Sequence, residues 1–168
     1  SNGMFTGTLT LPSTLKTIGA SAFVYADFSG ELLIPDGVTS IGANAFKECD
    51  GFGGTLSLPD SVKTVGEWAF YSCEGFTGLK LPAGLTKIET LSFAFMAGLK
   101  TEVVIPEGVT EIGEGAFECS YMPFVRLPST LKKIEKQAFM YAHNLTKITL
   151  PDGLETIGDE AFDGCRFK

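Results

Sequence analysis

The sequence lacks the long apolar segments of membrane-spanning proteins and the basic charge of nucleic-acid-binding proteins. No apolar run approaches the roughly 20 residues of a membrane-spanning helix, and no signal peptide is recognisable. Lys and Arg total 13 against 20 Asp and Glu, so the 168-residue chain has a net charge of −7. This charge disfavours nucleic-acid binding, which needs a basic stripe to neutralise phosphates, and it disfavours docking on an anionic membrane.

Residues that carry catalysis or hold metal ions are scarce as well. His143 is the only histidine, and the sequence offers no nucleophile or orienting partner for it. The carboxylates are scattered over turns, often just after a proline, with no paired acid and base. The four cysteines lack the close spacing of zinc ligands, and no glycine-rich loop opens a long helix. We therefore expect no enzyme activity, no cofactor and no metal site.

The sequence has instead one pattern that is repeated along its whole length. Each repeat has a proline and, eleven residues later, a phenylalanine, and successive prolines lie 22 to 24 residues apart. A period of this length predicts a solenoid, in which each coil buries its apolar face only against its neighbours. The prolines are Pro12, Pro35, Pro59, Pro82, Pro106, Pro128 and Pro151, and the phenylalanines are Phe23, Phe46, Phe70, Phe93, Phe117, Phe139 and Phe162.

Each repeat predicts two extended segments and one turn. In residues 55–58 leucine alternates with Thr or Ser, which is typical of a strand with one buried face, and a proline then ends the strand. In residues 62–65 two valines lie three apart, which fits a second, shorter strand or a corner. Ala69, Phe70 and Cys73 have the spacing of one face of a helical turn. The predicted fold is thus an α/β repeat solenoid.

Written as LxLPxxLxxIGxxAFxxC, the pattern resembles the BspA-like, or Treponema-type, class of leucine-rich repeats along essentially the whole chain. The resemblance implies a right-handed solenoid with a concave parallel β-sheet. The seven prolines predict about seven repeats, and the Ala-Phe-Cys spacing predicts short helical turns on the side opposite the sheet. It also implies a surface or secreted protein of bacteria or of some parasitic protists, associated with adhesion and without catalytic residues. We expect residues 1–168 to form one solenoid domain, a piece of a longer array.

Three of the cysteines share one position in the repeat. Cys49, Cys73 and Cys165 lie three residues after the repeat Phe, where other repeats have Ala or Met, and Cys119 is displaced by one residue. A position that accepts these residues predicts a small buried hydrophobic side chain. The favoured interpretation is therefore structural thiols. A disulfide between Cys49 and Cys73 on adjacent coils and a metal site are the alternatives.

Outward positions of the predicted sheet form two columns. The first three coils carry mostly Thr and Ser there, whereas the later coils combine charged and apolar residues, and an exposed Phe beside an Arg is typical of an interface. The alternative is ordinary variation on a solvated sheet. One column runs Thr10, Leu33, Ser57, Lys80, Val104, Arg126, Thr149, and the other runs Thr8, Glu31, Thr55, Gly78, Glu102, Phe124, Lys147. The candidate ligand-binding residues are Lys80, Glu102, Val104, Phe124 and Arg126.

A second candidate patch lies on the turn side of the third and fourth coils. Trp68, Tyr71, Leu91 and Phe95 occupy neighbouring positions outside the core there. The cluster fits a patch that binds a partner, or simple packing at an edge.

The function expected from these observations is a binding or adhesion module at the cell surface or outside the cell. Its partner would be a host or neighbouring-cell protein or glycan, recognised through the solenoid surface. The alternative is a structural spacer that presents another domain. Because terminal coils leave apolar surface uncovered, end-to-end self-association is also expected.

Overall fold

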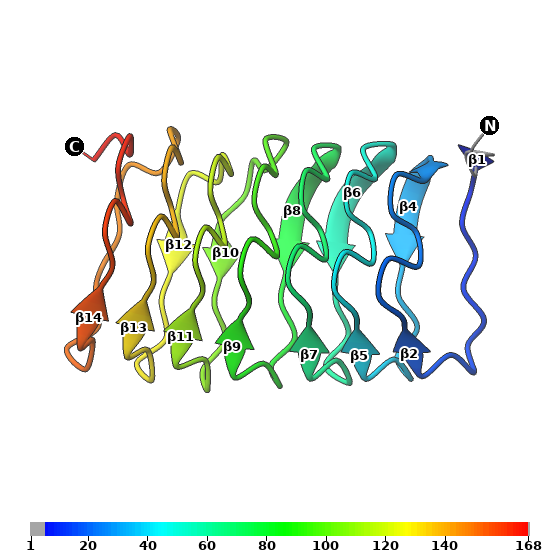
Figure 1. Cartoon of the computed structure of the whole chain (residues 1–168), viewed down its shortest axis with the longest axis horizontal. Helices are drawn as coiled ribbons and strands as arrows, with labels where there is room; N and C mark the ends of the chain where they lie inside the picture. Colours follow the sequence, from blue (N-terminus) through cyan, green and yellow to red (C-terminus); the bar gives the residue numbers. More distant parts are fainter. Residues whose placement is uncertain (1–5, 168) are drawn as a thin grey trace.

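The computed structural model describes residues 6–167, and they form a stack of parallel coils (Figure 1). Strands of equivalent repeats lie side by side along the stack, and the two ends of the chain lie at opposite ends of it (Figure 1). Residues 6–167 contain no α-helix, and so no helix in them is long and apolar enough to cross a membrane.

Two faces of the stack are built from parallel strands. The first, which we call the long-strand face, confirms the predicted alternating strands of the second to sixth repeats, whereas residues 9–11 and 148–150 form no strand. This face contains β1 (Thr6–Gly7), β3 (Asp27–Phe28), β4 (Gly30–Leu33), β6 (Phe52–Ser57), β8 (Phe76–Lys80), β10 (Val103–Val104) and β12 (Val125–Arg126). The second, the short-strand face, confirms a strand where the sequence also allowed a corner; it contains β2 (Thr17–Ile18), β5 (Ser40–Ile41), β7 (Thr64–Val65), β9 (Lys87–Ile88), β11 (Glu111–Ile112), β13 (Lys133–Ile134) and β14 (Thr156–Ile157).

Hydrogen bonding in both faces links each coil to the next. On the short-strand face the orders are β2-β5-β7 and β9-β11-β13-β14, and on the long-strand face they are β1-β3, β4-β6-β8 and β10-β12. Every pair is parallel, and partners lie about one repeat apart, as for Ile88 and Ile112. Two-residue strands are stable here because each coil is held between two neighbours.

The third side of each coil is a turn ladder rather than the helical turn that the Ala-Phe-Cys spacing predicted. The N–H of Phe46 donates to the carbonyl of Ala69 on the next coil at 2.8 Å, and the N–H of Phe70 donates in the same way to Ser92 at 2.9 Å. The intervening N–H groups donate three residues back, as from Ala45 to Gly42 at 3.3 Å. The prediction of short helical turns is therefore wrong for residues 6–167.

Backbone angles show why these residues cannot form a helix. Each coil has a positive-φ residue two positions before the repeat Phe and another two positions after it, such as Asn44 (φ 57°) and Glu48 (φ 57°) around Phe46. A left-handed residue turns the chain so that alternate N–H groups point at the neighbouring coil. A right-handed helix would instead direct all of them along the coil itself.

The repeat phenylalanines form a continuous ring stack through the core. Successive rings from Phe23 to Phe162 have centroids 5.1 to 5.8 Å apart and lie nearly parallel. A second aromatic stack, of Phe28, Phe52 and Phe76, lies beside it, with centroids 6.0 and 6.1 Å apart. The core is therefore a column along the stack axis, and each coil contributes the same few side chains to it.

The stack has about six turns, fewer than the seven that counting prolines predicted. Phe46 and Phe139 are fully buried, whereas Phe23 in the first coil and Phe162 in the last are only partly covered. At the C-terminal end Ile157 is 48% exposed, although its counterparts in the other coils belong to the core.

Candidate functional site

The long-strand face brings most of the predicted outward columns together. Val104 is the direct ladder partner of Arg126, and Phe124 is the partner of Lys147. In the earlier coils Ser57 pairs with both Leu33 and Lys80. These pairings confirm that the columns run across neighbouring coils.

One position departs from the predicted register. Glu31 pairs with Gly53 rather than with Thr55, because the pairing shifts between Glu31 and Leu33. The extra residues form a bulge within β6, where Gly54 has a positive-φ conformation (φ 73°). The register of this strand is thus set partly by a bulge.

A groove lies over the later coils of this face. It has a volume of about 490 Å³ and is lined by residues that include Glu102, Phe124, Arg126, Lys147 and Thr149. Phe124 is 48% exposed in it, which is unusual for a large aromatic side chain with a core available next to it. The groove therefore combines an accessible apolar surface with charges of both signs.

Arg126 forms an ion pair with Glu102 in this groove. One guanidinium nitrogen of Arg126 donates to both carboxylate oxygens of Glu102, at 3.0 and 3.2 Å. Both side chains are well exposed, so the pair contributes little to stability, about 0–1 kcal/mol. It links two neighbouring coils, and the guanidinium and Phe124 both line the groove.

Of the five candidate residues, three line this groove and two do not. Lys80 lies with Leu33 and Ser57 along a different depression of about 320 Å³, over the earlier coils. Val104 is 44% exposed beside Arg126 but lines neither depression. The candidate set is therefore not one site. Lys147 and Thr149 also line the groove and stand in the two columns, but they are not among the five candidate residues. The groove is formed by three successive coils, and the columns alone do not show which coils share it.

The second candidate patch is a packed cluster. The rings of Trp68 and Tyr71 have centroids 4.7 Å apart, and those of Tyr71 and Phe95 are 5.0 Å apart. The ammonium group of Lys47 lies 4.7 Å from the centroid of Trp68 and makes a cation–π contact with it. Leu91 lies in the next coil, in the same repeat position as Trp68. All of these side chains are half-buried, so the structure places them together on the turn side.

Charges around the patch act on its tyrosine. Burial raises the pKa of the Tyr71 hydroxyl, and the negative charges of Glu118 and Glu48 raise it further. Burial also raises the pKa of Glu118. Tyr71 therefore stays protonated at neutral pH and can donate a hydrogen bond at the surface.

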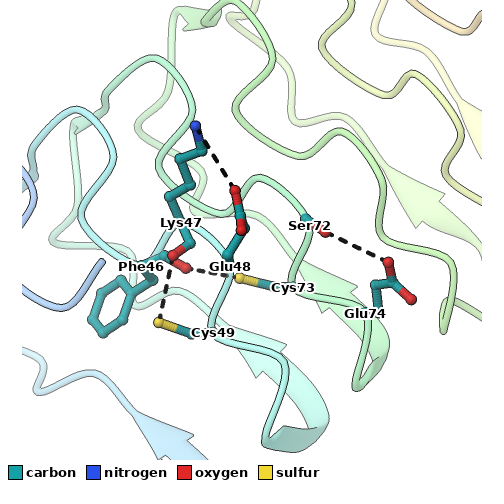
Figure 2. A network of polar contacts seen from close by, with 7 residues as sticks. All are labelled: Phe46, Lys47, Glu48, Cys49, Ser72, Cys73 and Glu74. Carbon is teal, nitrogen blue, oxygen red and sulfur yellow. Dashed lines mark hydrogen bonds and ion pairs between the residues drawn. The ribbon is translucent and has the colours of Figure 1, made fainter. Parts of the chain in front are cut away.

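The shared cysteine position satisfies a backbone group of the preceding coil. The thiol of Cys73 lies 3.0 Å from the carbonyl oxygen of Phe46 and donates to it (Figure 2). The thiol of Cys49 likewise donates to the carbonyl oxygen of Phe23 at 3.0 Å. Ser120 occupies this position in the repeat where Cys119 is displaced, and its hydroxyl donates to Phe93 at 2.7 Å. The four cysteines are free thiols, and residues 6–167 contain no group of three or more His, Cys, Asp and Glu side chains that could hold a metal ion.

The buried thiols should resist alkylation in the folded protein. Burial raises the pKa of Cys49 from 9.0 to about 11 and raises that of Cys73 as well, so little reactive thiolate exists near pH 8. We expect iodoacetamide to label Cys119, which is partly exposed, well before Cys49 and Cys73. Mass spectrometry after timed labelling measures this order. Equal labelling of all three in folded protein would contradict the burial.

The same shift predicts how stability changes with pH. Below about pH 9 the thiol of Cys49 is protonated in both the folded and the unfolded protein, and its contribution to the free energy of unfolding is complete. As the pH rises toward about 11, the thiol ionises only in the unfolded chain, so the free energy of unfolding falls. A Cys49→Ser variant should lose less stability over this interval, since Ser120 shows that a hydroxyl fits this position. An identical pH dependence in both proteins would contradict this account.

The fold and the repeat pattern together define a leucine-rich-repeat solenoid. The sequence matches the BspA type Leucine rich repeat region in 6 copies, over residues 5–120 and 54–168. The chain therefore belongs to the BspA-type leucine-rich-repeat family, whose members are generally non-enzymatic and typically bind proteins at surfaces. None of the curated protein sequences matches it.

Solved structures of bacterial repeat proteins resemble the chain closely. A Treponema pallidum leucine-rich-repeat protein is 28% identical with a TM-score of 0.86, over 98% of this chain and 78% of that one. A leucine-rich cell surface protein of Faecalibacterium prausnitzii is 30% identical with a TM-score of 0.82, over 100% of this chain and 47% of that one. A leucine-rich-repeat protein of Eubacterium ventriosum is 25% identical with a TM-score of 0.84, over 99% and 44%. The chain thus spans about half the length of the last two.

Proposed function

We propose that the chain is a binding module of a cell-surface or secreted protein and that it holds a protein or glycan ligand in the groove of the long-strand face. The observation that carries this is Phe124, an exposed aromatic side chain that lines a groove of about 490 Å³ together with the ion-paired guanidinium of Arg126. Aromatic and arginine side chains are the residues that most often dominate binding energy.

The repeat scaffold gives Phe124 no structural reason to be there. The equivalent outward positions of the earlier coils are Thr55 and Gly78, and both are compatible with the same strand pairing. An apolar ring at such a position keeps a hydrophobic surface in contact with water, at a cost that contact with a ligand removes. The similarity to a bacterial protein described as a cell surface protein supports the same location for this module.

The test is a double variant, Phe124→Ala with Arg126→Ala, probed on an array of purified extracellular-matrix proteins and glycans. Removing two central anchors should weaken binding to any ligand that the wild-type chain retains by about a hundredfold or more. The circular dichroism melt should stay unchanged, because both side chains lie outside the core.

The matched control replaces exposed residues outside this groove, Leu33→Ala with Lys63→Ala. Leu33 is 71% exposed on the same face, so the control removes an apolar and a basic side chain without touching the groove. Binding that survives in the Phe124 variant would eliminate this groove as the site. An array that retains no wild-type protein at all would favour the spacer function.

A further inference from the structure

One position of the repeat changes its charge halfway along the stack. It lies four residues after the repeat Phe, in the loop that leads to the long-strand face. Its occupants in order are Asp27, Asp50, Glu74, Ala97, Tyr121, His143 and Arg166. The backbone at this position varies from strand at Asp27 to turn at Glu74 and His143, and this variation does not follow the switch from acids to aromatic and basic residues. Because such a switch follows the axis of the stack, it creates one electrically distinct surface.

A groove lies where the basic half of this column meets its neighbours. Its volume is about 530 Å³, and its lining lies within residues 99–166, toward the C-terminal end of the stack. Its polar lining is Lys100, Tyr121, His143, Asn144, Thr146 and Arg166. No carboxylate lines it, although the chain has 20 acidic residues against 13 basic ones.

The two strong cations of this groove are not engaged elsewhere. Lys100 and Arg166 are exposed, and neither forms an ion pair within residues 6–167. By contrast Arg126, Lys87 and Lys132 are all paired with glutamates. Unpaired cations that converge on a groove without acids favour an anionic ligand.

The histidine between them is held in a fixed orientation. Its Nδ1 lies 2.9 Å from the carbonyl oxygen of Gly164. Since a carbonyl only accepts, Nδ1 carries a proton, and Nε2 has no partner within residues 6–167. The ring stands between Tyr121 and Tyr141, with centroid distances of 6.0 and 5.8 Å. The groove thus has aromatic walls as well as charge.

From this geometry we infer that the groove binds a carbohydrate that bears a carboxylate. Lys100 and Arg166, three coils apart along the groove, supply the positive charge for the carboxylate and charge-assisted contacts with other sugar oxygens. The half-buried ring of Tyr121 packs against the apolar face of the sugar, and Asn144 and Thr146 exchange hydrogen bonds with its hydroxyl groups. A volume of about 530 Å³ lies within the range of small-ligand sites and is sufficient for one or two sugar rings. The site is independent of the groove that contains Phe124, since the two share no residue.

His143 supplies a direct reporter because the chain has no other histidine. We would titrate the protein with sialyllactose and with a uronic-acid oligosaccharide, and follow the imidazole carbon-bound proton signals by NMR. Saturable shifts are expected with both acidic sugars, and none with lactose or a neutral oligosaccharide of equal length. Saturation by neither acidic sugar overturns the inference. Equal binding of a polyglutamate peptide would show that the groove recognises charge alone, which also overturns it.

Matched variants separate the groove from general electrostatics. Lys100→Gln with Arg166→Gln should weaken the acidic sugars about tenfold or more, because two charge-assisted contacts are lost. Lys16→Gln with Lys63→Gln changes the net charge equally but at distant exposed positions, and should leave binding unchanged. Equal weakening in both variants would contradict a specific site. The Phe124→Ala/Arg126→Ala variant should retain sugar binding, so failure of the proposed function and failure of this site give different results.

Discussion

Replacing Phe93 with alanine is expected to lower the free energy of unfolding by about 3–5 kcal/mol. Its ring is fully buried and stacks on both neighbours, 5.7 Å from Phe70 and 5.8 Å from Phe117. Truncation leaves a cavity and removes two ring contacts at once. In a repeat stack each coil is stabilised only by the adjacent ones, so the change weakens the interfaces on both sides in the middle of the array. Native domains have a free energy of unfolding of only about 5–15 kcal/mol, so the substitution removes much of the stability.

Urea unfolding followed by circular dichroism measures this effect. Phe124→Ala is the matched control, because it makes the same truncation at a side chain that is 48% exposed, and it should cost less than about 1 kcal/mol. Should Phe93→Ala not fold at all, Phe93→Leu keeps an apolar side chain in place and should lose about 1–2 kcal/mol. A loss below about 1 kcal/mol for Phe93→Ala would mean that the ring stack is not the core of the protein.

The period and the strands of the fold follow from the sequence, but the turns do not. Proline and phenylalanine at fixed separations, with alternating leucines between repeats, are enough to predict a stack of parallel strands. The spacing of Ala69, Phe70 and Cys73 indicated a helical turn, because residues three and four apart share one helical face. The same spacing serves a turn ladder whose positive-φ positions hold Trp68 and Ser72. The residue types do not indicate these positive-φ positions, since neither residue is glycine.

The candidate site was predictable as columns but not as grooves. Alternation places Phe124 and Arg126 outward, two residues apart on one strand, and the structure confirms both as exposed. Which of these residues share a depression depends on loop length and side-chain direction, and these separate Lys80 from the others. The switch from acidic to basic residues four positions after the repeat Phe can be recognised when repeats are aligned. Identifying the groove at His143 still requires the distances between segments of four successive coils.

Replacing Gly98 with alanine is the second substitution with a large expected effect, and its cause is the approach of one coil to the next. A Cβ on Gly98 would lie 2.1 Å from the carbonyl oxygen of Glu74 and 2.6 Å from that of Phe76. Both atoms belong to the backbone and cannot rotate away, and Gly98 is not among the positive-φ glycines, so the penalty is purely steric. We expect a loss of about 2–3 kcal/mol, as for strongly overpacked sites.

Gly53→Ala is the matched control, because its nearest neighbour, the carbonyl oxygen of Gly75, would be 3.9 Å from the added Cβ. Thermal unfolding should therefore separate the two variants clearly. Gly98→Ala should also affect ligand binding, because Lys100 and Glu102 follow Gly98 closely in the sequence. Lys100 lines the groove at His143 and Glu102 lines the groove at Phe124. Spreading the coils at this corner should weaken both kinds of binding in the molecules that remain folded. A wild-type melting temperature in Gly98→Ala would mean that the coil spacing adapts easily, and then the repeat would not hold either groove in a fixed shape.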